Sequence, residues 1–266
     1  MIKVRLYLLL IFLATVGCSS SVSDFEDKIE ARVLENNGEM SSLEIKAAAV
    51  YLDAWSKEDF YQDDIDKFKE AYKGVFPDKD LILFTGSSSI RFWSTLKEDM
   101  APHKVLNRGF GGAHIAHVNY HFDEIVTPYK PKAIVFFCGT NDLSAFKSPK
   151  ETFEDFSAFF SRIKNELPGT KLIVIGVKPS TARAYLAPEE QEFNNLISNL
   201  AKEEDRLSYV SVWNPMLTDE GEANPDLFVE DGLHMNEKGY EICTRLVKPE
   251  LDNLNLWEEV LTSYNP

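Results

Sequence analysis

Five short apolar runs, separated by longer segments with helical periodicity, constrain the fold of this chain more than any other feature. The runs are rich in β-branched and aromatic residues and have the length of strands. Continuous apolar strands that alternate with helices predict an α/β fold, a three-layer α/β/α sandwich around a mostly parallel five-stranded sheet. The expected strands lie at 81–84, 105–107, 133–138, 172–177 and 209–212, and the expected helices at about 114–126, 150–166, 187–204 and 237–254.

The turn after the first run carries a candidate nucleophile. Gly86 breaks the strand, serines occupy positions 87–89, and Ile90, Phe92 and Trp93 open an amphipathic helix. A hydroxyl at a strand-to-helix turn lies at the rim of a sheet, beside the unpaired N–H groups of the first helical turn. This arrangement suits a serine nucleophile, and a serine-rich helix cap is the alternative.

Polar or glycine-rich segments also follow the later strands. The carboxyl ends of the strands share one edge of an open parallel sheet, and ligands bind there. We therefore expect these segments to converge. They are residues 107–112, 139–142 and 178–183 after the second, third and fourth strands, and 231–234 beyond the fifth.

In this order the segments resemble the four blocks of the SGNH hydrolase superfamily, also called GDSL esterases and lipases, which centre on Ser, Gly, Asn and His. The resemblance covers about residues 62–254 and implies a flavodoxin-like sheet and a serine esterase. The family's first block is Gly-Asp-Ser, so aligning its glycine with Gly86 gives Ser88 as the nucleophile. Ser87 replaces the family's aspartate and is the alternative nucleophile.

Asp231 and His234 are the expected partners of the nucleophile. Imidazole has an unperturbed pKa near ~6.5 and suits proton transfer at neutral pH. A carboxylate three residues earlier can reach Nδ1 of His234, which fixes the tautomer and stabilises the imidazolium. An ordinary turn is the alternative role of the segment.

Three donors are expected to form an oxyanion hole: the backbone N–H groups of Ser88 and Gly112 and the side-chain amide of Asn141. Glycine leaves room for an approaching oxyanion, and asparagine is a neutral donor. A flexible glycine turn and an Asx turn are the alternatives. We further expect Asp142 to cap the segment that follows it, and residues 107 and 108 to brace the site.

Two other features admit more than one interpretation. Arg183 follows the fourth strand at the site edge, where it could bind a carboxylate or a polar headgroup of the substrate, or form a structural ion pair. His114, His117 and His121 share one helical face and could bind zinc. Because ester hydrolysis through Ser88 needs neither a metal nor a cofactor, we expect none.

The first 18 residues have the features of a secretory signal. Lys3 and Arg5 precede a short apolar run and small residues. The segment 15–18 resembles the lipobox of bacterial lipoproteins, in which Cys18 is lipidated. A cleaved signal or an uncleaved anchor is the alternative. Lipidation implies a membrane-held protein of the bacterial cell envelope, at the outer membrane or facing the periplasm where a cell has two membranes.

Composition and spacing lead to the remaining predictions, on domain bounds, nucleic-acid binding and the cysteines. Residues 19–60 are expected to form an acidic tether and a helical extension, with a capping box at Ser41 and Glu44, and residues 61–266 the hydrolase domain. A formal net charge of −15 and no basic patch argue against nucleic-acid binding. Cys138 and Cys243 are expected to be separate buried thiols. The oligomeric state is open.

These features together predict an esterase that forms an acyl-enzyme on Ser88, with His234 as the base. The resemblance implies a small-molecule or glycan ester, with a short or acetyl acyl group, as the substrate. An acyltransferase with the same triad is the first alternative. A catalytically silent surface module that binds glycans is the second.

Overall fold

The computed structural model describes residues 20–71 and 80–254 of the 266-residue chain. The expected signal at 1–18, with Cys18, lies outside these residues. The chain divides after Trp55 into two compact units, and each is described by itself. No helix among the described residues has both the length and the apolar character needed to span a bilayer.

The first unit contains two packed helices, α1 (Ser20–Glu35) and α2 (Ser42–Trp55). The predicted capping box precedes α2: Ser41 N–H donates to Glu44 Oε2 at 2.8 Å, and Glu44 N–H donates to Ser41 Oγ at 3.3 Å. The start of the expected tether is helical, since α1 begins at Ser20. Val22 and Ile29 are buried, and their i, i+7 spacing places both on the same face of α1.

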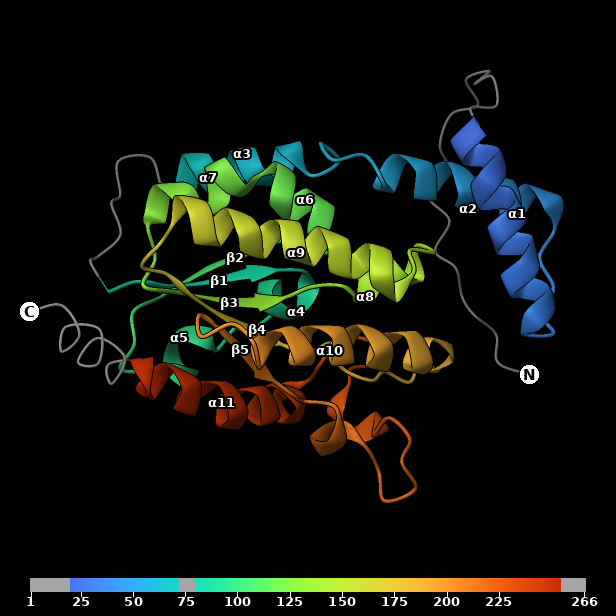
Figure 1. Ribbon diagram of the computed structural model, residues 1–266. Helices are drawn as coiled ribbons and strands as arrows, with labels where there is room; N and C mark the ends of the chain where they lie inside the picture. The colour runs from blue at the N-terminus through green and yellow to red at the C-terminus, as the bar shows by residue number, and fades with distance from the viewer. Residues whose placement is uncertain (1–19, 72–79, 255–266) are drawn as a thin grey trace, which may run out of the picture. The chain divides into compact units, whose positions relative to one another are not determined.

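A five-stranded parallel sheet forms the centre of the second unit (Figure 1). The strand order is β2-β1-β3-β4-β5, which is the flavodoxin-like order. The predicted fold is therefore confirmed. The strands are β1 (Ile82–Gly86), β2 (Val105–Gly109), β3 (Ala133–Phe137), β4 (Lys171–Ile175) and β5 (Leu207–Val210).

The helices of the second unit connect and cover these strands. They differ from the sequence prediction in two places, since the expected helix at 114–126 is split at His121 and the helix after β1 is a single turn. The α-helices are α3 (Gln62–Ala71), α4 (Ser88–Arg91), α5 (Leu96–Asp99), α6 (Ile115–Tyr120), α7 (Phe122–Ile125), α8 (Thr140–Ser144), α9 (Pro149–Glu166), α10 (Ala187–Ala201) and α11 (Glu237–Asp252). Four 3₁₀ turns lie at Thr127–Tyr129, Ala184–Leu186, Asn214–Met216 and Pro225–Leu227.

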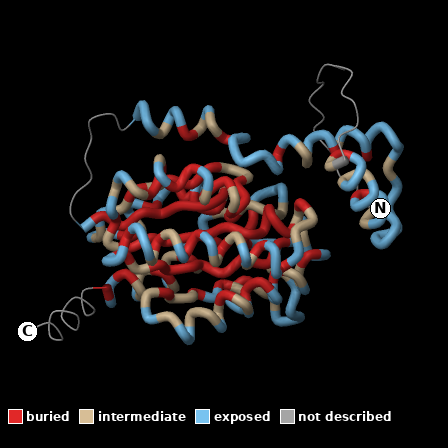
Figure 2. The backbone as a smooth tube through the Cα atoms, turned by 45° about the horizontal axis from the view of Figure 1, so that its top comes forward, coloured by how far each residue is buried: buried red, intermediate tan, exposed pale blue. Residues whose placement is uncertain are grey.

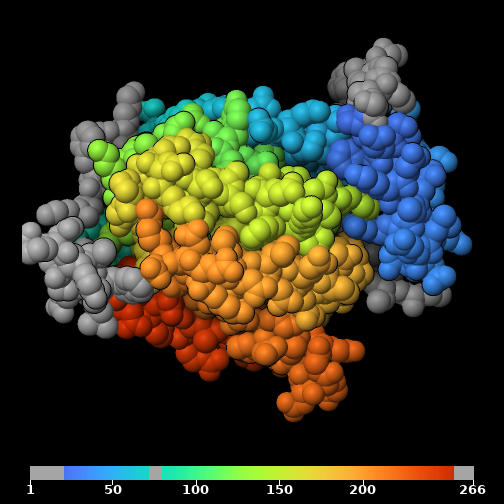
Figure 3. Space-filling model, in the orientation of Figure 1, coloured from blue at the N-terminus to red at the C-terminus, as the bar shows by residue number. Residues whose placement is uncertain are grey.

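Apolar side chains on both faces of the sheet explain why its strands have no polar alternation. Phe136 stacks on Phe159 of α9 with ring centroids 4.5 Å apart. Its neighbour Phe137 points to the opposite core, which it shares with Trp93 and with Val247 of α11. The central strands β1 and β3 are buried along their whole length, within the buried interior that Figure 2 shows. Figure 3 shows α9 and α10 side by side. This double covering leaves the strand ends as the accessible part of the sheet.

Candidate active site

The turn after β1 is fixed by a close backbone approach. Gly86 has φ +126°, and a Cβ there would lie 2.0 Å from the carbonyl oxygen of Phe137. Ser87 N–H donates to the same oxygen at 2.9 Å, and the Ser87 side chain is buried. Ser88 is the first residue of α4, so its N–H has no acceptor within the helix. The glycine therefore positions Ser88 at the carboxyl edge of the sheet.

His234 lies beside Ser88, although the two residues are 146 positions apart. Ser88 Oγ and His234 Nε2 are 3.0 Å apart, and His234 Nδ1 and Asp231 Oδ2 are 2.6 Å apart. The hydroxyl can donate to Nε2 only when Nδ1–H donates to the carboxylate, which defines the tautomer. Phe92 packs edge-on against the imidazole, with centroids 5.0 Å apart. The structure thus joins the three predicted catalytic side chains in one hydrogen-bonded chain.

The loop that carries Asp231 is organised by its own backbone. Asp231 Oδ1 accepts the N–H groups of Leu233 at 2.8 Å and His234 at 2.9 Å. Burial alone would raise the pKa of Asp231, but the hydrogen bonds from His234 and from these two N–H groups outweigh it and lower the pKa. Gly232 has φ +66° and lies against Thr181, where a Cβ would meet Oγ1 at 2.3 Å. A charged carboxylate is therefore held in place to orient His234.

Asn141 lies across the pocket, in α8. Its Nδ2 donates to the carbonyl of Ala113 at 3.1 Å, and its Oδ1 accepts from Arg183 Nη1 at 3.0 Å. The pocket is lined by Ser87, Ser88, Ser89, Phe137, Thr140, Asn141, Lys178, Arg183, Leu233 and His234. Two of the three expected oxyanion donors, Ser88 and Asn141, thus line one pocket.

The third expected donor, Gly112, is next to a residue bonded to Asn141 but is not among the lining residues. Gly112 has φ +80° and directly precedes Ala113, whose carbonyl accepts from Asn141. Phe110 N–H donates to Gly86 O at 3.0 Å, which ties this loop to the end of β1. The glycine turn is therefore held at the same edge of the sheet.

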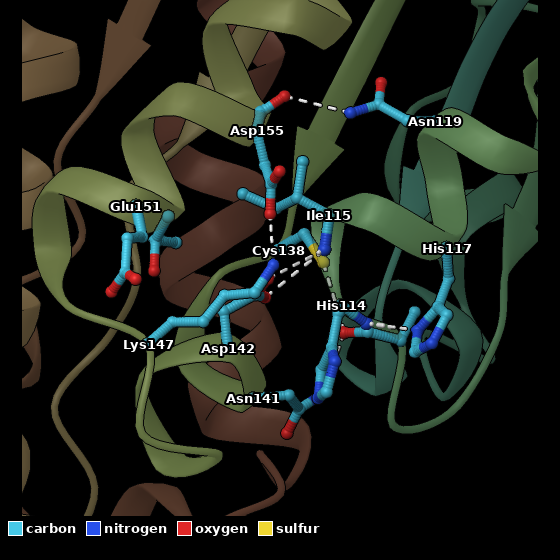
Figure 4. Close-up of polar contacts among 12 residues, drawn as sticks. His114, Ile115, His117, Asn119, Cys138, Asn141, Asp142, Lys147, Glu151 and Asp155 are labelled. Atoms are coloured by element: carbon cyan, nitrogen blue, oxygen red, sulfur yellow. Dashed lines mark hydrogen bonds and ion pairs between the residues drawn. The ribbon is translucent and has the colours of Figure 1, made fainter. Parts of the chain in front are cut away.

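Asp142 has a different role from the predicted one. It is fully buried, and both carboxylate oxygens accept the N–H of Ile115, at 3.1 and 3.3 Å (Figure 4). It therefore caps α6, which precedes it in the chain, rather than the segment that follows. Burial raises the pKa of Asp142 to about 7, although Lys147 Nζ lies 3.8 Å from Oδ1. The prediction was wrong because the partner is 27 residues away.

The two residues after Leu106, which were expected to brace the site, bond to neighbouring segments. Asn107 Nδ2 donates to Ile90 O at 2.6 Å, and Asn107 Oδ1 accepts Gly109 N–H at 2.9 Å. Arg108 is buried and donates to the hydroxyl of Tyr129 from Nε and Nη2, at 3.1 and 2.8 Å. These contacts join the loop after β2 to its neighbours.

The three histidines near α6 are held by different partners. His117 Nδ1 accepts the N–H of His114 at 2.9 Å, so its Nε2 carries the proton and donates to Lys57 O at 3.0 Å. His121 Nδ1 lies 2.7 Å from Glu124 Oε2. Within residues 20–71 and 80–254, no three His, Cys, Asp or Glu side chains are placed to hold a metal ion.

Both cysteines of the described part of the chain are free and buried, as predicted. Cys138 Sγ donates to Ala113 O at 3.2 Å, and Cys243 lies 3.7 Å from the sulfur of Met235. Burial raises the pKa of both thiols, that of Cys243 to about 12. Neither thiol is therefore a candidate nucleophile at neutral pH.

Sequence reasoning assigned no role to Lys178, although it lines the pocket. Its Nζ donates to the carbonyl of Leu233 at 2.6 Å and lies over the ring of Phe228 at 5.0 Å. Burial lowers the pKa of Lys178 to about 8. Its position directly after the apolar run of β4, at the edge that carries the site, is the signal that could have identified it.

Comparisons with known proteins show the family of the chain. Residues 74–242 match the sequence profile of the GDSL-like Lipase/Acylhydrolase family. Among proteins with curated descriptions, none matches this chain.

Solved structures share the fold at low sequence identity. A structure described as a platelet activating factor from Streptococcus pneumonia has a TM-score of 0.66 and 18% identity, over 80% of this chain and 100% of that one. A GDSL-like lipase from Bacteroides thetaiotaomicron has a TM-score of 0.60 and 22% identity, over 75% and 98%. A carbohydrate esterase of family 3 from Talaromyces cellulolyticus has a TM-score of 0.52 and 15% identity, over 66% and 97%. The family match covers more than half of the chain, which therefore belongs to the GDSL-like lipase/acylhydrolase family and is an ester hydrolase.

Proposed function

We propose that the protein hydrolyses carboxylic esters through an acyl-enzyme on Ser88. Ser88 Oγ attacks the ester carbonyl carbon while His234 Nε2 takes the hydroxyl proton, and the carbonyl oxygen becomes an oxyanion. Collapse of the tetrahedral intermediate breaks the bond to the leaving alkoxide, which takes the proton from His234. The 3.0 Å separation of Oγ and Nε2 is the observation that carries this proposal.

The second half of the reaction uses the same groups with water in place of the alcohol. His234 takes a proton from water, the hydroxide attacks the acyl carbon, and Ser88 Oγ leaves with the proton that His234 returns. Asp231 stabilises the imidazolium at both stages, because it is a charged carboxylate bonded to Nδ1. The N–H of Ser88 and the amide of Asn141 are the donors to the oxyanion.

The size of the pocket supports a short acyl group. Its empty space, including the open mouth, is about 250 Å³. Because that value includes open solvent, the room left for the acyl group itself is smaller and suits a short chain. The likeness to a carbohydrate esterase fits an ester on a glycan, and the exposed rings of Phe92 and Tyr185 offer apolar surface near the site. We infer a short-chain, acetyl-type ester of a sugar or another small alcohol as the substrate.

The N-terminal sequence supports a location at the membrane of the cell envelope. Cys18 follows a short apolar run and small residues, which is the pattern of a lipidated signal. Replacing Cys18 with alanine should move the protein from the membrane fraction to the soluble fraction and abolish labelling by a palmitate analogue. Retention of both in the variant would contradict lipidation at this residue.

The proposed mechanism is tested with the full chain in detergent and a series of p-nitrophenyl esters. We expect turnover to fall from acetate to octanoate, and Ser88→Ala to lower kcat by about 10⁴-fold or more. Ser87→Ala is the matched control and should keep most of the activity, because its side chain is buried in the turn. A fluorophosphonate adduct mapped to Ser88 would identify the nucleophile, and an adduct on Ser87 would overturn the assignment.

A further inference from the structure

The hydrogen-bond partners of Arg183 differ from those of its two expected roles, substrate binding and a structural ion pair. It lies between β4 and α10, and Nη1 donates to Asn141 Oδ1 at 3.0 Å and to Thr140 O at 3.3 Å. Within residues 20–71 and 80–254, no carboxylate forms an ion pair with it at 4 Å or less. The guanidinium therefore contacts the backbone carbonyl of Thr140 and the side chain of Asn141, which is the expected oxyanion donor.

The chemistry of the two neighbours of Asn141 defines the orientation of its amide. A guanidinium only donates, so its partner must be the amide oxygen. The carbonyl of Ala113 only accepts, so its partner must be Nδ2. Both contacts require the same orientation, and they leave the second N–H of Nδ2 for the pocket that Asn141 lines with Ser88. Without Arg183, rotation of the amide by 180° could direct its oxygen at the oxyanion.

We propose that Arg183 is a positioning residue that holds Asn141 as an oxyanion donor and polarises its amide. This inference rests on the proposed esterase function. A charged donor on Oδ1 withdraws electron density from the amide and strengthens donation by Nδ2. The same positive charge lies behind the oxyanion as it develops, in a site of low dielectric constant. Neither effect requires contact between Arg183 and the substrate.

The surroundings of Arg183 leave its charge largely uncompensated. Glu190 is buried, its carboxylate oxygens have no hydrogen-bond partner among the described residues, and burial raises its pKa to about 8. Glu190 is therefore mostly neutral at pH 7 and does not cancel the guanidinium. Tyr185 and Asp231 are the other acidic groups that act on Arg183, and Asp231 is already bonded to His234.

The first test compares Arg183→Met with Arg183→Lys on p-nitrophenyl acetate, a neutral ester. We expect Arg183→Met to lower kcat by about 10- to 50-fold, less than the ~10²–10³ typical of losing a donor, with KM changed less than about twofold. Arg183→Lys keeps the charge and one donor and should recover part of the loss. Methylboronic acid, which forms an anionic tetrahedral adduct on a serine, should bind more weakly to Arg183→Met by a similar factor.

Arg206 provides a matched control. It also donates to backbone carbonyls, at 2.9 Å to Pro168 and 3.1 Å to Ile163, but it lies before β5 at the opposite edge of the sheet. Arg206→Met should leave kcat within about twofold of the wild type. Thermal denaturation of both Met variants separates a loss of stability from a loss of positioning.

A double-mutant cycle with Asn141→Ala distinguishes positioning from substrate binding. If Arg183 acts through Asn141, adding Arg183→Met to Asn141→Ala should change kcat by less than about threefold. Fully multiplicative effects would overturn the proposal. So would a variant that keeps kcat for p-nitrophenyl acetate and raises KM only for p-nitrophenyl succinate, because Arg183 would then bind a substrate carboxylate. An inactive wild type would instead overturn the proposed function, and this inference with it.

Discussion

The two sides of the Ser88 pocket are built in different ways. The base wall, residues 231–234, orients His234 through hydrogen bonds between residues two or three positions apart, and Asp231 is exposed. Its backbone carbonyls are also bonded to a distant segment, by Lys178 and Ala182. The oxyanion wall, Asn141 with Asp142, is buried and bonded to residues 27 to 42 positions away. Substitutions in the base wall should therefore change chemistry alone, whereas those in the oxyanion wall should change chemistry and stability together.

The two aspartates of these walls show the same contrast in their ionisation. The carboxylate of Asp231 accepts three hydrogen bonds and has a lowered pKa despite its partial burial. Asp142 is fully buried, and the loss of solvation raises its pKa to about 7. The base wall thus contains a charged carboxylate, Asp231, that acts in catalysis. The oxyanion wall contains Asp142, whose carboxyl group is harder to ionise because it is buried.

The largest expected effect is on the base wall. Asp231→Asn should lower kcat by about 10⁴-fold, because an amide no longer selects the tautomer of His234 or stabilises its imidazolium. The melting temperature should change little, since the side chain is exposed. Glu230→Gln, its exposed neighbour, is the control and should keep full activity. A loss smaller than about tenfold in Asp231→Asn would show that the base wall does not orient His234.

Asn141→Ala tests whether the oxyanion wall couples chemistry to stability. We expect kcat to fall by about 10²–10³. Unfolding in urea should also become about 1–3 kcal/mol easier, because Ala113 O and Arg183 each lose one hydrogen bond. Asn119→Ala removes a comparable bond, to Asp155 O at 3.0 Å, outside the site and should lower stability alone. Unchanged stability in Asn141→Ala would remove the difference between the walls.

A smaller effect concerns the pH dependence of stability. Because the folded-state pKa of Asp142 is raised, the folded state binds a proton more tightly than the unfolded state between about pH 4 and pH 7. Its contribution to stability is full below that window and falls as pH rises through it. From pH 5 to pH 7 the loss is about 2 kcal/mol, at 1.36 kcal/mol per unit.

Asp142→Asn should remove that slope, as measured by urea unfolding at pH 5, 6 and 7 against the wild type. Asp155→Asn is a comparison, because Asp155 also pairs with Lys147 but is not fully buried. An unchanged slope in Asp142→Asn would mean that the folded protein holds this carboxylate charged throughout the range.

The smallest expected effect comes from Lys178, which links the base wall to the end of β4. Lys178→Met keeps the length of the side chain but removes the donor to Leu233 O. We expect kcat to fall about tenfold as the loop loosens, corresponding to about 1.4 kcal/mol. Stability should change by less than about 1 kcal/mol, since a buried cation is replaced by an apolar side chain. An unaltered kcat would show that local hydrogen bonds suffice to hold the base wall.

Much of this structure could be read from local patterns. Continuous apolar runs predicted the strands, and polar residues after them predicted the edge at which Ser88, Asn141 and His234 meet. The spacing of Asp231 and His234, taken together with the upstream blocks, predicted their contact, because a carboxylate three residues before an imidazole can reach it within one turn. The same holds for the capping box at Ser41.

The tertiary structure alone decided what each distant side chain contacts. The start of the segment expected to be an acidic tether forms α1, in which Val22 and Ile29 are buried. Asp142 caps α6, and Arg183 reaches Asn141 rather than a carboxylate. Periodicity and turn chemistry are properties of neighbouring residues, so the sequence determined the strands and the base wall. The partners across the oxyanion wall depend on which strand ends the crossovers bring together, and only the folded chain defines them.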